Sequence, residues 1–356
     1  MKEHNFPQLL NNKLLKAARG EKVDTVPVWI MRQAGRYLPE FREFRTKHDF
    51  FSICQTPTLA CEVTLQPIKR FQLDASIIFS DILVIPQAMG LTVEMRPGVG
   101  PVLPRPLVLP ADMSRLRKPN VNEDLGYVGE AITLTRQSLQ GKVPLIGFTG
   151  APWTLMSYMV QGSGSSTMAQ ARSWLYKYPE ASHKLLQMIT DVVIEYLVMQ
   201  VTAGAQVLQV FESHADYFDD ILFEEFSLKY FKQISEGVRK QVKEKNLPEV
   251  PMIAFPKGAT LTSLEVLAKL ELYEVIGLDW TIDPVLARSR LGPNVTLQGN
   301  LDPCALYASE DKVYEYARKM VKAFGKDRYI ANLGHGILPD IPIKSVEAFI
   351  RGVHSV

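Results

Sequence analysis

Eight short runs along the chain consist almost entirely of apolar residues, and polar or turn-forming residues stop each of them. Nearly continuous apolar character, without alternation of apolar and polar positions, is typical of strands that are buried on both faces. The eight expected strands are residues 26–31, 75–79, 144–148, 207–211, 250–255, 274–278, 295–298 and 329–333.

Segments with helical periodicity lie between most of these runs, and one follows the last run. Examples are residues 188–201, 223–244, 261–269, 311–324 and 343–353. Eight strands that alternate with helices favour an α/β fold of the (β/α)8 barrel type. A doubly wound open sheet is the alternative, because short apolar runs are easily miscounted.

The chain shows no Ser/Gly-rich linker and no change of composition that would divide it. We therefore expect one barrel domain over residues 1–356. The proline-rich stretch 97–110 is interpreted as a surface excursion that follows the second strand.

Composition and charge narrow the functional class. Of the 356 residues, 46% are hydrophobic and 22% are charged, as in an ordinary globular protein. Forty Lys and Arg against 38 Asp and Glu give a net charge of +2, which excludes a general polyanion binder such as a nonspecific nucleic-acid protein but not a locally basic cleft. Three cysteines without CxxC spacing indicate reduced thiols in the cytoplasm.

No membrane segment is expected. Residues 1–10 are polar and lack the apolar stretch of a signal peptide. The longest apolar stretches, such as residues 191–201, are interrupted by Glu195 and Tyr196 and are too short to cross a bilayer. Residues 9–18 predict a leading helix that packs on the body of the protein, with an amphipathic presequence as the alternative.

Polar and glycine residues follow every expected strand. In a barrel the catalytic groups lie at the C-terminal strand ends, so these residues converge on one face, as an active site requires. In chain order they are Arg32-Gln33-Ala34-Gly35-Arg36, Ser80-Asp81, Thr149-Gly150-Ala151-Pro152, Glu212-Ser213-His214, Pro256-Lys257-Gly258, Asp279-Trp280, Gly299-Asn300-Leu301-Asp302 and Gly334-His335-Gly336.

Five cations lie within 16 residues after the first strand, namely Arg32, Arg36, Arg42, Arg45 and Lys47. Guanidinium groups match carboxylates and phosphates bidentately, so the cluster indicates a ligand with several such groups. The alternative is a solvated charge run that pairs with neighbouring acidic residues. The glycine between the first two arginines lets the backbone approach a ligand closely, which favours a binding role for this pair.

Asp81 and His335 are the other candidate site residues. Asp81 either faces a ligand or caps a helix. The β-branched residues that follow it run into Pro86, which favours the ligand-facing role. His335, between two glycines, is a candidate general acid, metal ligand or donor to an anion. The chain has no HxH or HExxH spacing and its cysteines lie far apart, so we expect no metal site.

Two further motifs suggest chemistry that we do not expect. Ser213 and His214 are adjacent, so their side chains point to opposite sides of a strand, and no GxSxG motif is present. A serine hydrolase is therefore disfavoured. Residues 162–167 resemble a phosphate loop but lack its GK[ST] ending. We interpret them as a mobile lid or as a cap for a helix that begins at Ser166 or Thr167.

Several sequence blocks resemble the uroporphyrinogen decarboxylase family. The segments PVWIMRQAGR at 27–36 and GFTGAPWTLMSY at 147–158 match its two signatures. The resemblance runs from near the N-terminus to about residue 350. Further matching blocks are IIFSDIL at 77–83, FESHA at 211–215, GLDWT at 277–281, LQGNLDP at 297–303 and YIANLGHG at 329–336.

The resemblance implies a single distorted (β/α)8 barrel that forms a cytoplasmic homodimer. It implies removal of the four acetate carboxylates of uroporphyrinogen, which gives coproporphyrinogen in haem biosynthesis, without a cofactor or metal. The chain departs from the family at Gln161, Asp216 and residues 256–258, which would lie near the cleft and could alter isomer preference or product release. The positions that the resemblance assigns to the tetrapyrrole are Arg32, Ala34, Arg36, Arg45, Asp81, Tyr158, Ser213 and His335.

The expected chemistry also fits these residue types. An alkyl carboxylate loses CO2 when its electron pair has an acceptor, and a pyrrole protonated at a ring carbon is such an acceptor. Asp81 would accept hydrogen bonds from the pyrrole N–H groups and stabilise the cationic ring, while Arg32 and Arg36 hold the acetates and propionates. The identity of the proton donor stays open, and the candidates are an arginine, a water molecule and a carboxyl group with a shifted pKa.

Two other functions stay open at this point. A zinc- or corrinoid-dependent methyltransferase can share this barrel, but no cysteine neighbours His335 to help bind zinc. A non-catalytic tetrapyrrole binder would bind the macrocycle tightly without turning it over.

Overall fold

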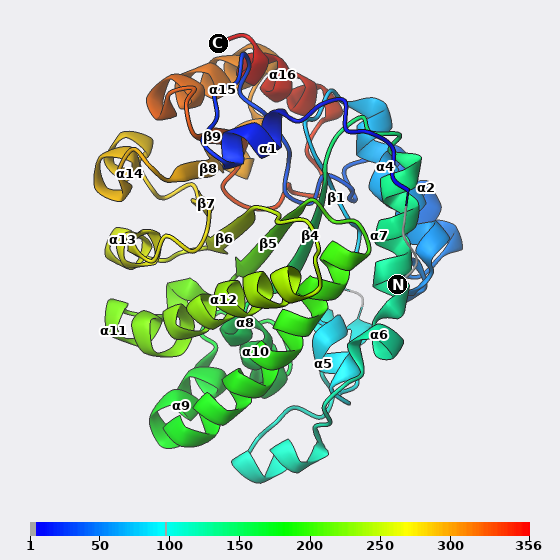
Figure 1. Ribbon diagram of the computed structural model, residues 1–356, viewed down its shortest axis with the longest axis vertical. Helices are drawn as coiled ribbons and strands as arrows, with labels where there is room; N and C mark the ends of the chain where they lie inside the picture. Colours follow the sequence, from blue (N-terminus) through cyan, green and yellow to red (C-terminus); the bar gives the residue numbers. More distant parts are fainter. Residues whose placement is uncertain (1–4, 97) are drawn as a thin grey trace.

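The structure is a computed structural model that describes residues 5–96 and 98–356. Two parts of the chain lie outside the described residues. They are residues 1–4, which begin the polar N-terminal segment and include His4, and Pro97, where the expected surface excursion starts. Seven parallel strands form one curled sheet in the order β1-β4-β5-β6-β7-β8-β9 (Figure 1). They are β1 (Ser76–Ile77), β4 (Leu145–Gly150), β5 (Val207–Glu212), β6 (Met252–Pro256), β7 (Val275–Gly277), β8 (Thr296–Leu301) and β9 (Tyr329–Leu333).

The strand order follows the chain without a reversal. Seven of the eight expected runs are therefore confirmed as strands, with ends that differ by three residues or fewer. A doubly wound sheet reverses its order at a switch point, so that alternative is wrong. The fold is the α/β barrel type that the alternation of strands and helices predicts.

The prediction of a regular strand at residues 26–31 is wrong, because among the described residues this segment forms one isolated bridge, from Val28 to Ala331 of β9. The segment nevertheless closes the barrel. The Trp29 N–H donates to the Ala331 carbonyl at 3.3 Å, and the Asp74 N–H donates to the Val28 carbonyl at 2.8 Å. Pro27 has no N–H to donate, and the Asp74 carboxylate accepts the Val28 N–H at 2.9 Å. A continuous ladder of hydrogen bonds to the neighbouring strands therefore cannot form.

Helices cover the outside of the sheet (Figure 1). The expected helix 261–269 is confirmed as α13, while the expected helix 223–244 is divided by one π-helical turn at Glu224–Leu228. The helices are α1 (Lys13–Ala18), α2 (Pro39–Lys47), α3 (Phe50–Gln55), α4 (Pro57–Arg70), α5 (Val84–Ala88), α6 (Val121–Asp124), α7 (Gly126–Ser138), α8 (Pro152–Gln161), α9 (Ala169–Lys177), α10 (Pro179–Thr202), α11 (Asp220–Phe223), α12 (Lys229–Glu244), α13 (Leu261–Lys269), α14 (Pro284–Leu291), α15 (Glu310–Phe324) and α16 (Ile343–His354).

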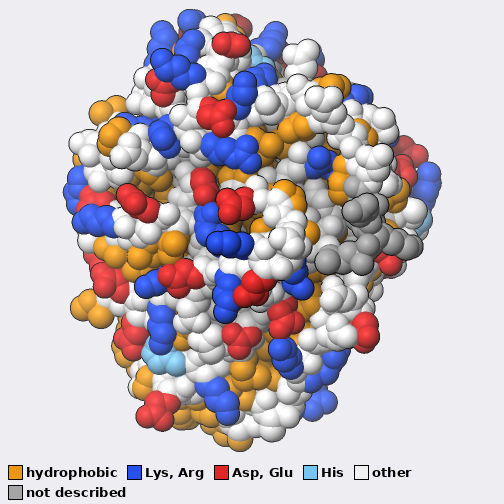
Figure 2. Space-filling model, in the orientation of Figure 1, with side chains coloured by type: hydrophobic (Ala, Val, Ile, Leu, Met, Phe, Trp, Pro, Cys, Tyr) orange, Lys and Arg blue, Asp and Glu red, His pale blue; other side chains and the backbone are white. Residues whose placement is uncertain are grey.

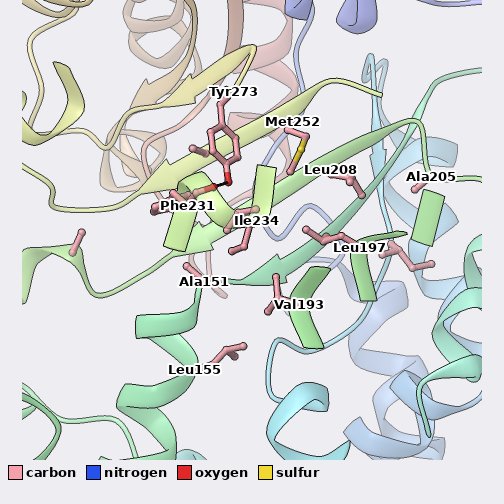
Figure 3. Packing of buried hydrophobic residues seen from close by; sticks show 14 of the residues in the cluster. Ala151, Leu155, Val193, Leu197, Ala205, Leu208, Phe231, Ile234, Met252 and Tyr273 are labelled. Atoms are coloured by element: carbon pink, nitrogen blue, oxygen red, sulfur yellow. Dashed lines mark hydrogen bonds between the residues drawn. The ribbon is translucent and has the colours of Figure 1, made fainter. Parts of the chain in front are cut away.

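Helix α10 is the one helix among the described residues that is long and apolar enough to cross a membrane. Its most apolar window is 67% buried inside the protein. Figure 3 shows Val193 and Leu197 of this helix beside Leu208 of β5 and Ile234 of α12. Its apolar character therefore serves the core between the sheet and the outer helices.

The N-terminal end of the barrel is closed by α1. Its residues Leu14, Ala17 and Ala18 are buried in one cluster with inward-facing strand residues such as Ile146 and Val207. Burying a leucine side chain of this kind stabilises the fold by about 1.5–3 kcal/mol. The leading helix is thus confirmed as packing on the body, although it is shorter than residues 9–18. With this end filled by apolar side chains, the opposite end is where the polar residues gather.

The surface carries both signs of charge, in agreement with the near-neutral composition. On the face shown in Figure 2, Lys and Arg side chains are interspersed with Asp and Glu. The expected surface excursion contains β3 (Gly100–Val102), which pairs antiparallel with β2 (Glu94–Arg96) just before it, and the sequence pattern did not predict this pair. Strands of three residues are too short for their pattern to be distinguished from a loop.

Candidate active site

Arg32 lies at the end of the segment that closes the barrel, beside His335 at the end of β9. A Cβ atom on Gly336 would lie 2.4 Å from Cδ of Arg32, so the arginine side chain passes directly over this glycine. Arg32 has a φ of 62°, a left-handed conformation that is uncommon outside glycine. The turn is held by a hydrogen bond from the Ile337 N–H to the Met31 carbonyl at 3.0 Å. Backbone strain of this kind is concentrated at functional sites.

Arg32, Asp81 and Tyr158 lie within reach of one another's charge. Burial lowers the pKa of Arg32, and the Asp81 carboxylate partly offsets this. Burial raises the pKa of Asp81, while hydrogen bonds from its following backbone and the charge of Arg32 act in the other direction. Burial likewise raises the pKa of Tyr158, and the neighbouring Asp81 adds to this increase. The structure therefore brings together three of the predicted site residues from three different elements.

The arrangement of these side chains indicates a concave mouth. Arg32 is exposed to solvent and Asp81 is half-buried by surface area. Protein atoms nevertheless surround both closely enough that desolvation is the largest influence on each pKa. Each of these side chains is therefore partly open to solvent and closely surrounded by protein. Such a site is suited to a large ligand that enters from solvent.

Asp81 combines a local role with its place in the mouth. Its Oδ1 accepts the Leu83 N–H at 2.9 Å, which braces the turn after β1. A short helix, α5, begins at Val84 and contains Pro86. Asp81 is not its N-cap, however, because that position belongs to Leu83. The ligand-facing role is thus compatible with the structure.

His335 is half-buried next to the aromatic ring of Trp280, with ring centroids 6.1 Å apart. Burial and the positive charge of Arg32 lower the pKa of His335. The imidazole is therefore neutral at pH 7, and it can donate one hydrogen bond to an anionic ligand without adding a charge.

His214 hydrogen bonds to a serine other than its sequence neighbour. Its Nδ1 lies 2.6 Å from Oγ of Ser157, and that hydroxyl donates to the Thr154 carbonyl at 2.7 Å. Burial lowers the pKa of His214 to about 4, so the neutral ring donates to Ser157. The Ser213 N–H instead donates to Oγ1 of Thr154 at 2.7 Å. The His214 ring thus pairs with Ser157 and not with its sequence neighbour Ser213.

Glu212 is a site residue that the sequence reasoning placed at a strand end but did not single out. It is fully buried at the end of β5, where it accepts hydrogen bonds from the Thr154 hydroxyl and, at 3.3 Å, from the His214 N–H. Burial raises its pKa to about 8, so the carboxyl is protonated at neutral pH. Through Thr154 it positions the backbone of Ser213. A glutamate directly after an expected buried strand was the available signal.

The cation cluster divides into two groups. Arg42 donates to the Arg36 and Tyr37 carbonyls at 2.8 and 3.2 Å, and Lys47 makes an exposed ion pair with Glu43. Lys47 thus pairs with an acidic residue, as the alternative of a solvated charge run expects, whereas Arg42 holds the local backbone.

The remaining predicted ligand residues lie around the same mouth or beside it. Arg36 is exposed one turn after Arg32, and Ala34 packs partly buried against the core. Arg45 lies on α2 and donates to the His48 carbonyl at 2.6 Å. Its charge and that of Asp81 both act on the buried Cys54 thiol, whose pKa burial raises.

The loop 162–167 is held by several contacts. The Leu103 N–H donates to the Gly162 carbonyl at 2.6 Å, and the Tyr217 hydroxyl donates to the Ser165 carbonyl at 3.0 Å. The expected helix start at Ser166 or Thr167 is wrong, because α9 begins at Ala169. The side chain of Gln161 accepts the Gln170 N–H at 3.1 Å and so stabilises the first turn of α9.

No group of three or more His, Cys, Asp or Glu side chains that could hold a metal ion occurs among residues 5–96 and 98–356.

Comparisons with known proteins agree with the sequence blocks. The family model described as uroporphyrinogen decarboxylase (URO-D) matches residues 9–356. A uroporphyrinogen decarboxylase of Danio rerio is 56% identical over 352 residues, covering 99% of this chain and 95% of that protein. One of Homo sapiens is 57% identical over 350 residues, with 98% and 95% coverage.

Among solved structures, a methyltransferase from Methanosarcina mazei aligns with a TM-score of 0.75 at 21% identity. The alignment covers 98% of this chain and 99% of that one. At this identity the likeness concerns the barrel fold alone.

Proposed function

The chain belongs to the uroporphyrinogen decarboxylase family, and we propose that the mouth formed by Arg32, Asp81, Tyr158 and His335 is its catalytic site. The activity is removal of carboxylates from uroporphyrinogen in porphyrin biosynthesis. The observation that supports this site is the desolvated Asp81 carboxylate beside the Arg32 guanidinium at the C-terminal end of the barrel.

Asp81 stabilises the charge that develops on the substrate. Each step begins with protonation of a pyrrole ring carbon, which makes the ring cationic. The bond between the acetate methylene and its carboxyl group then breaks, and its electron pair passes into the ring as CO2 leaves. Addition of a proton to the methylene carbon and loss of the proton from the ring carbon give the methyl group, so each step consumes one proton. An ionised Asp81 that accepts the pyrrole N–H groups lowers the energy of the cation.

The other residues hold the polyanionic substrate and supply the proton. Arg32 and Arg36 bind acetate and propionate carboxylates, with Ala34, Arg45, Tyr158, Ser213 and His335 completing the surface. The neutral His335 and the Ser213 hydroxyl supply hydrogen bonds without charge. Since a guanidinium stays protonated in proteins, the proposed acid is a water that Arg32 orients.

The finer assignments are also proposals. We propose that residues 1–356 act as one barrel domain, as a cytoplasmic homodimer that binds no membrane or nucleic acid and uses no cofactor or metal. Trp280, whose ring centroid lies 6.1 Å from that of His335, and Val285 and Leu286 on α14 are exposed apolar side chains that follow β7, and they support a self-association face. Sedimentation at several protein concentrations tests it.

Anaerobic incubation with uroporphyrinogen, followed by separation of the products by carboxyl number, tests the function. Appearance of species with seven to four carboxyl groups supports the proposed activity. Tight binding of the macrocycle without these products would instead identify a non-catalytic binder.

A further inference from the structure

Lys257 and Asp216, which follow neighbouring strands, form one ion pair at the mouth. The Nζ of Lys257, after β6, lies 2.8 Å from Oδ2 of Asp216, which follows β5. The lysine side chain is 20% exposed and the aspartate 40%. Within the described part of the chain, Asp216 is the one hydrogen-bond acceptor of this ammonium, which carries three donors.

The backbone around Lys257 is fixed, so its position at the rim is defined. The Lys257 N–H donates to the Glu212 carbonyl at 2.9 Å, and the Gly258 N–H donates to Oδ2 of Asp279 at 2.5 Å. Gly258 has a φ of 80°, and a Cβ atom there would lie 2.4 Å from Cβ of Asp216. The glycine therefore leaves room for the backbone and Cβ atom of residue 216.

Lys257 lies on the side of the mouth opposite the arginines. Around the barrel the order is residues 26–31, β1, β4, β5, β6, β7, β8 and β9. Arg32 follows the first of these eight segments and Lys257 the fifth, which is half a circuit away. Burial lowers the pKa of both His214 and His335, and the charge of Lys257 contributes a smaller decrease to each. Its charge therefore reaches residues that follow both β5 and β9.

The substrate carries carboxylates around its whole circumference, and cations on one side alone cannot reach those on the other. We propose that Lys257 is a second anchor for a substrate carboxylate, opposite Arg32 and Arg36. Asp216 holds the ammonium in place before binding, and the substrate carboxylate displaces it. This assignment rests on the proposed function. It predicts that Asp216 weakens substrate binding, because the incoming carboxylate must replace an existing partner.

Steady-state kinetics of Lys257→Gln and Asp216→Asn test the assignment. Lys257→Gln should raise KM about tenfold with kcat within about threefold, the pattern of a lost binding interaction that is equal in ground and transition states. Asp216→Asn should lower KM about threefold, since the competing carboxylate is removed. Lys118→Gln is the matched control, because it removes an exposed lysine that forms a 2.9 Å ion pair with Glu195. It should leave KM unchanged.

The double variant separates competition for Lys257 from simple charge repulsion. In the Lys257→Gln background, Asp216→Asn should give no further decrease in KM. The proposal is wrong if Lys257→Gln changes KM by less than twofold, or if the gain from Asp216→Asn persists without the lysine. Lys257→Arg keeps the charge and should retain a KM within about threefold of wild type, which provides a test even if the glutamine variant folds poorly.

A binding measurement distinguishes failure of this inference from failure of the proposed function. Fluorescence titration with oxidised uroporphyrin, which carries the same eight carboxylates, reports binding without turnover. An equal Kd for wild type and Lys257→Gln overturns the anchor while decarboxylation by wild type still stands. A roughly tenfold weaker Kd supports the anchor whether or not turnover is observed.

Discussion

Replacing Asp81 by asparagine removes one negative charge from the mouth and changes little else. Asparagine keeps the size of the side chain and an oxygen that can accept the Leu83 N–H, which Oδ1 of Asp81 now accepts at 2.9 Å. The turn after β1 should therefore persist, and much of the substrate affinity with it. What is lost is an interaction that is stronger with the cationic ring than with the neutral substrate.

The magnitude follows from Coulomb's law. A unit charge about 5 Å from the ring cation, at an effective dielectric constant of about 20, contributes about 3 kcal/mol. At about 1.4 kcal/mol for each tenfold change in rate, kcat should fall by roughly 10²–10³. This range also matches the loss of one preorganised electrostatic group in other active sites. Asp81→Glu should retain more activity than Asp81→Asn, because the charge is kept although it is displaced.

The assay is anaerobic decarboxylation with products separated by carboxyl number, so that all four steps are followed. Each step should slow, since every pyrrole passes through the same cationic state. Asp112→Asn is the matched control, because Oδ2 of Asp112, in the short 3-10 helix Pro110–Arg115, also accepts backbone N–H groups, from Val108 and Leu109 at 2.9 Å. It should stay within a few-fold of wild type. Turnover by Asp81→Asn within a few-fold of wild type would refute the charge-stabilising role and leave Asp81 as a turn residue.

Four further outcomes are expected. Arg32→Ala or Arg36→Ala should fold normally but raise KM, and the wild-type KM should rise with added salt, as measured in a sodium chloride series. Activity should survive exhaustive chelation and dialysis, and restoration of a lost activity by zinc would contradict this. The folded-state pKa of Glu212 is about 8, so its contribution to stability is lost as the pH rises toward and through that value. The melting temperature between pH 5 and 9 should therefore depend less on pH in Glu212→Gln than in wild type. Burial alone would raise the pKa of Asp74, but hydrogen bonds from His354, Lys13, Asn11 and the Val28 N–H lower it to about 2. Above the unfolded pKa near 3.8, this carboxylate contributes about 2 kcal/mol to the free energy of unfolding, and the contribution is lost as the pH falls toward 2. Urea titrations at several pH values should show this loss in wild type but not in Asp74→Asn.

The pattern of apolar runs was sufficient to predict the architecture. Continuous apolar strands that alternate with amphipathic helices are local properties, so seven strands and helices such as α13 and α16 appear at or near the expected residues. The placement of Arg32, Asp81 and His335 at strand ends was also a local property, because parallel strands in a closed barrel bring all such ends to one face. For the same reason the candidate site could be predicted before its geometry was known.

Contacts between distant segments were decided only by the tertiary structure. Asp74 interrupts the ladder of residues 26–31 because barrel closure brings its carboxylate to the Val28 N–H, and no pattern within either segment encodes that contact. The neutral Glu212 and the pairing of His214 with Ser157 arise in the same way, from burial and from packing of α8 against the end of β5. Sequence periodicity records which face of an element is buried, whereas hydrogen-bond partners and pKa values depend on which elements meet.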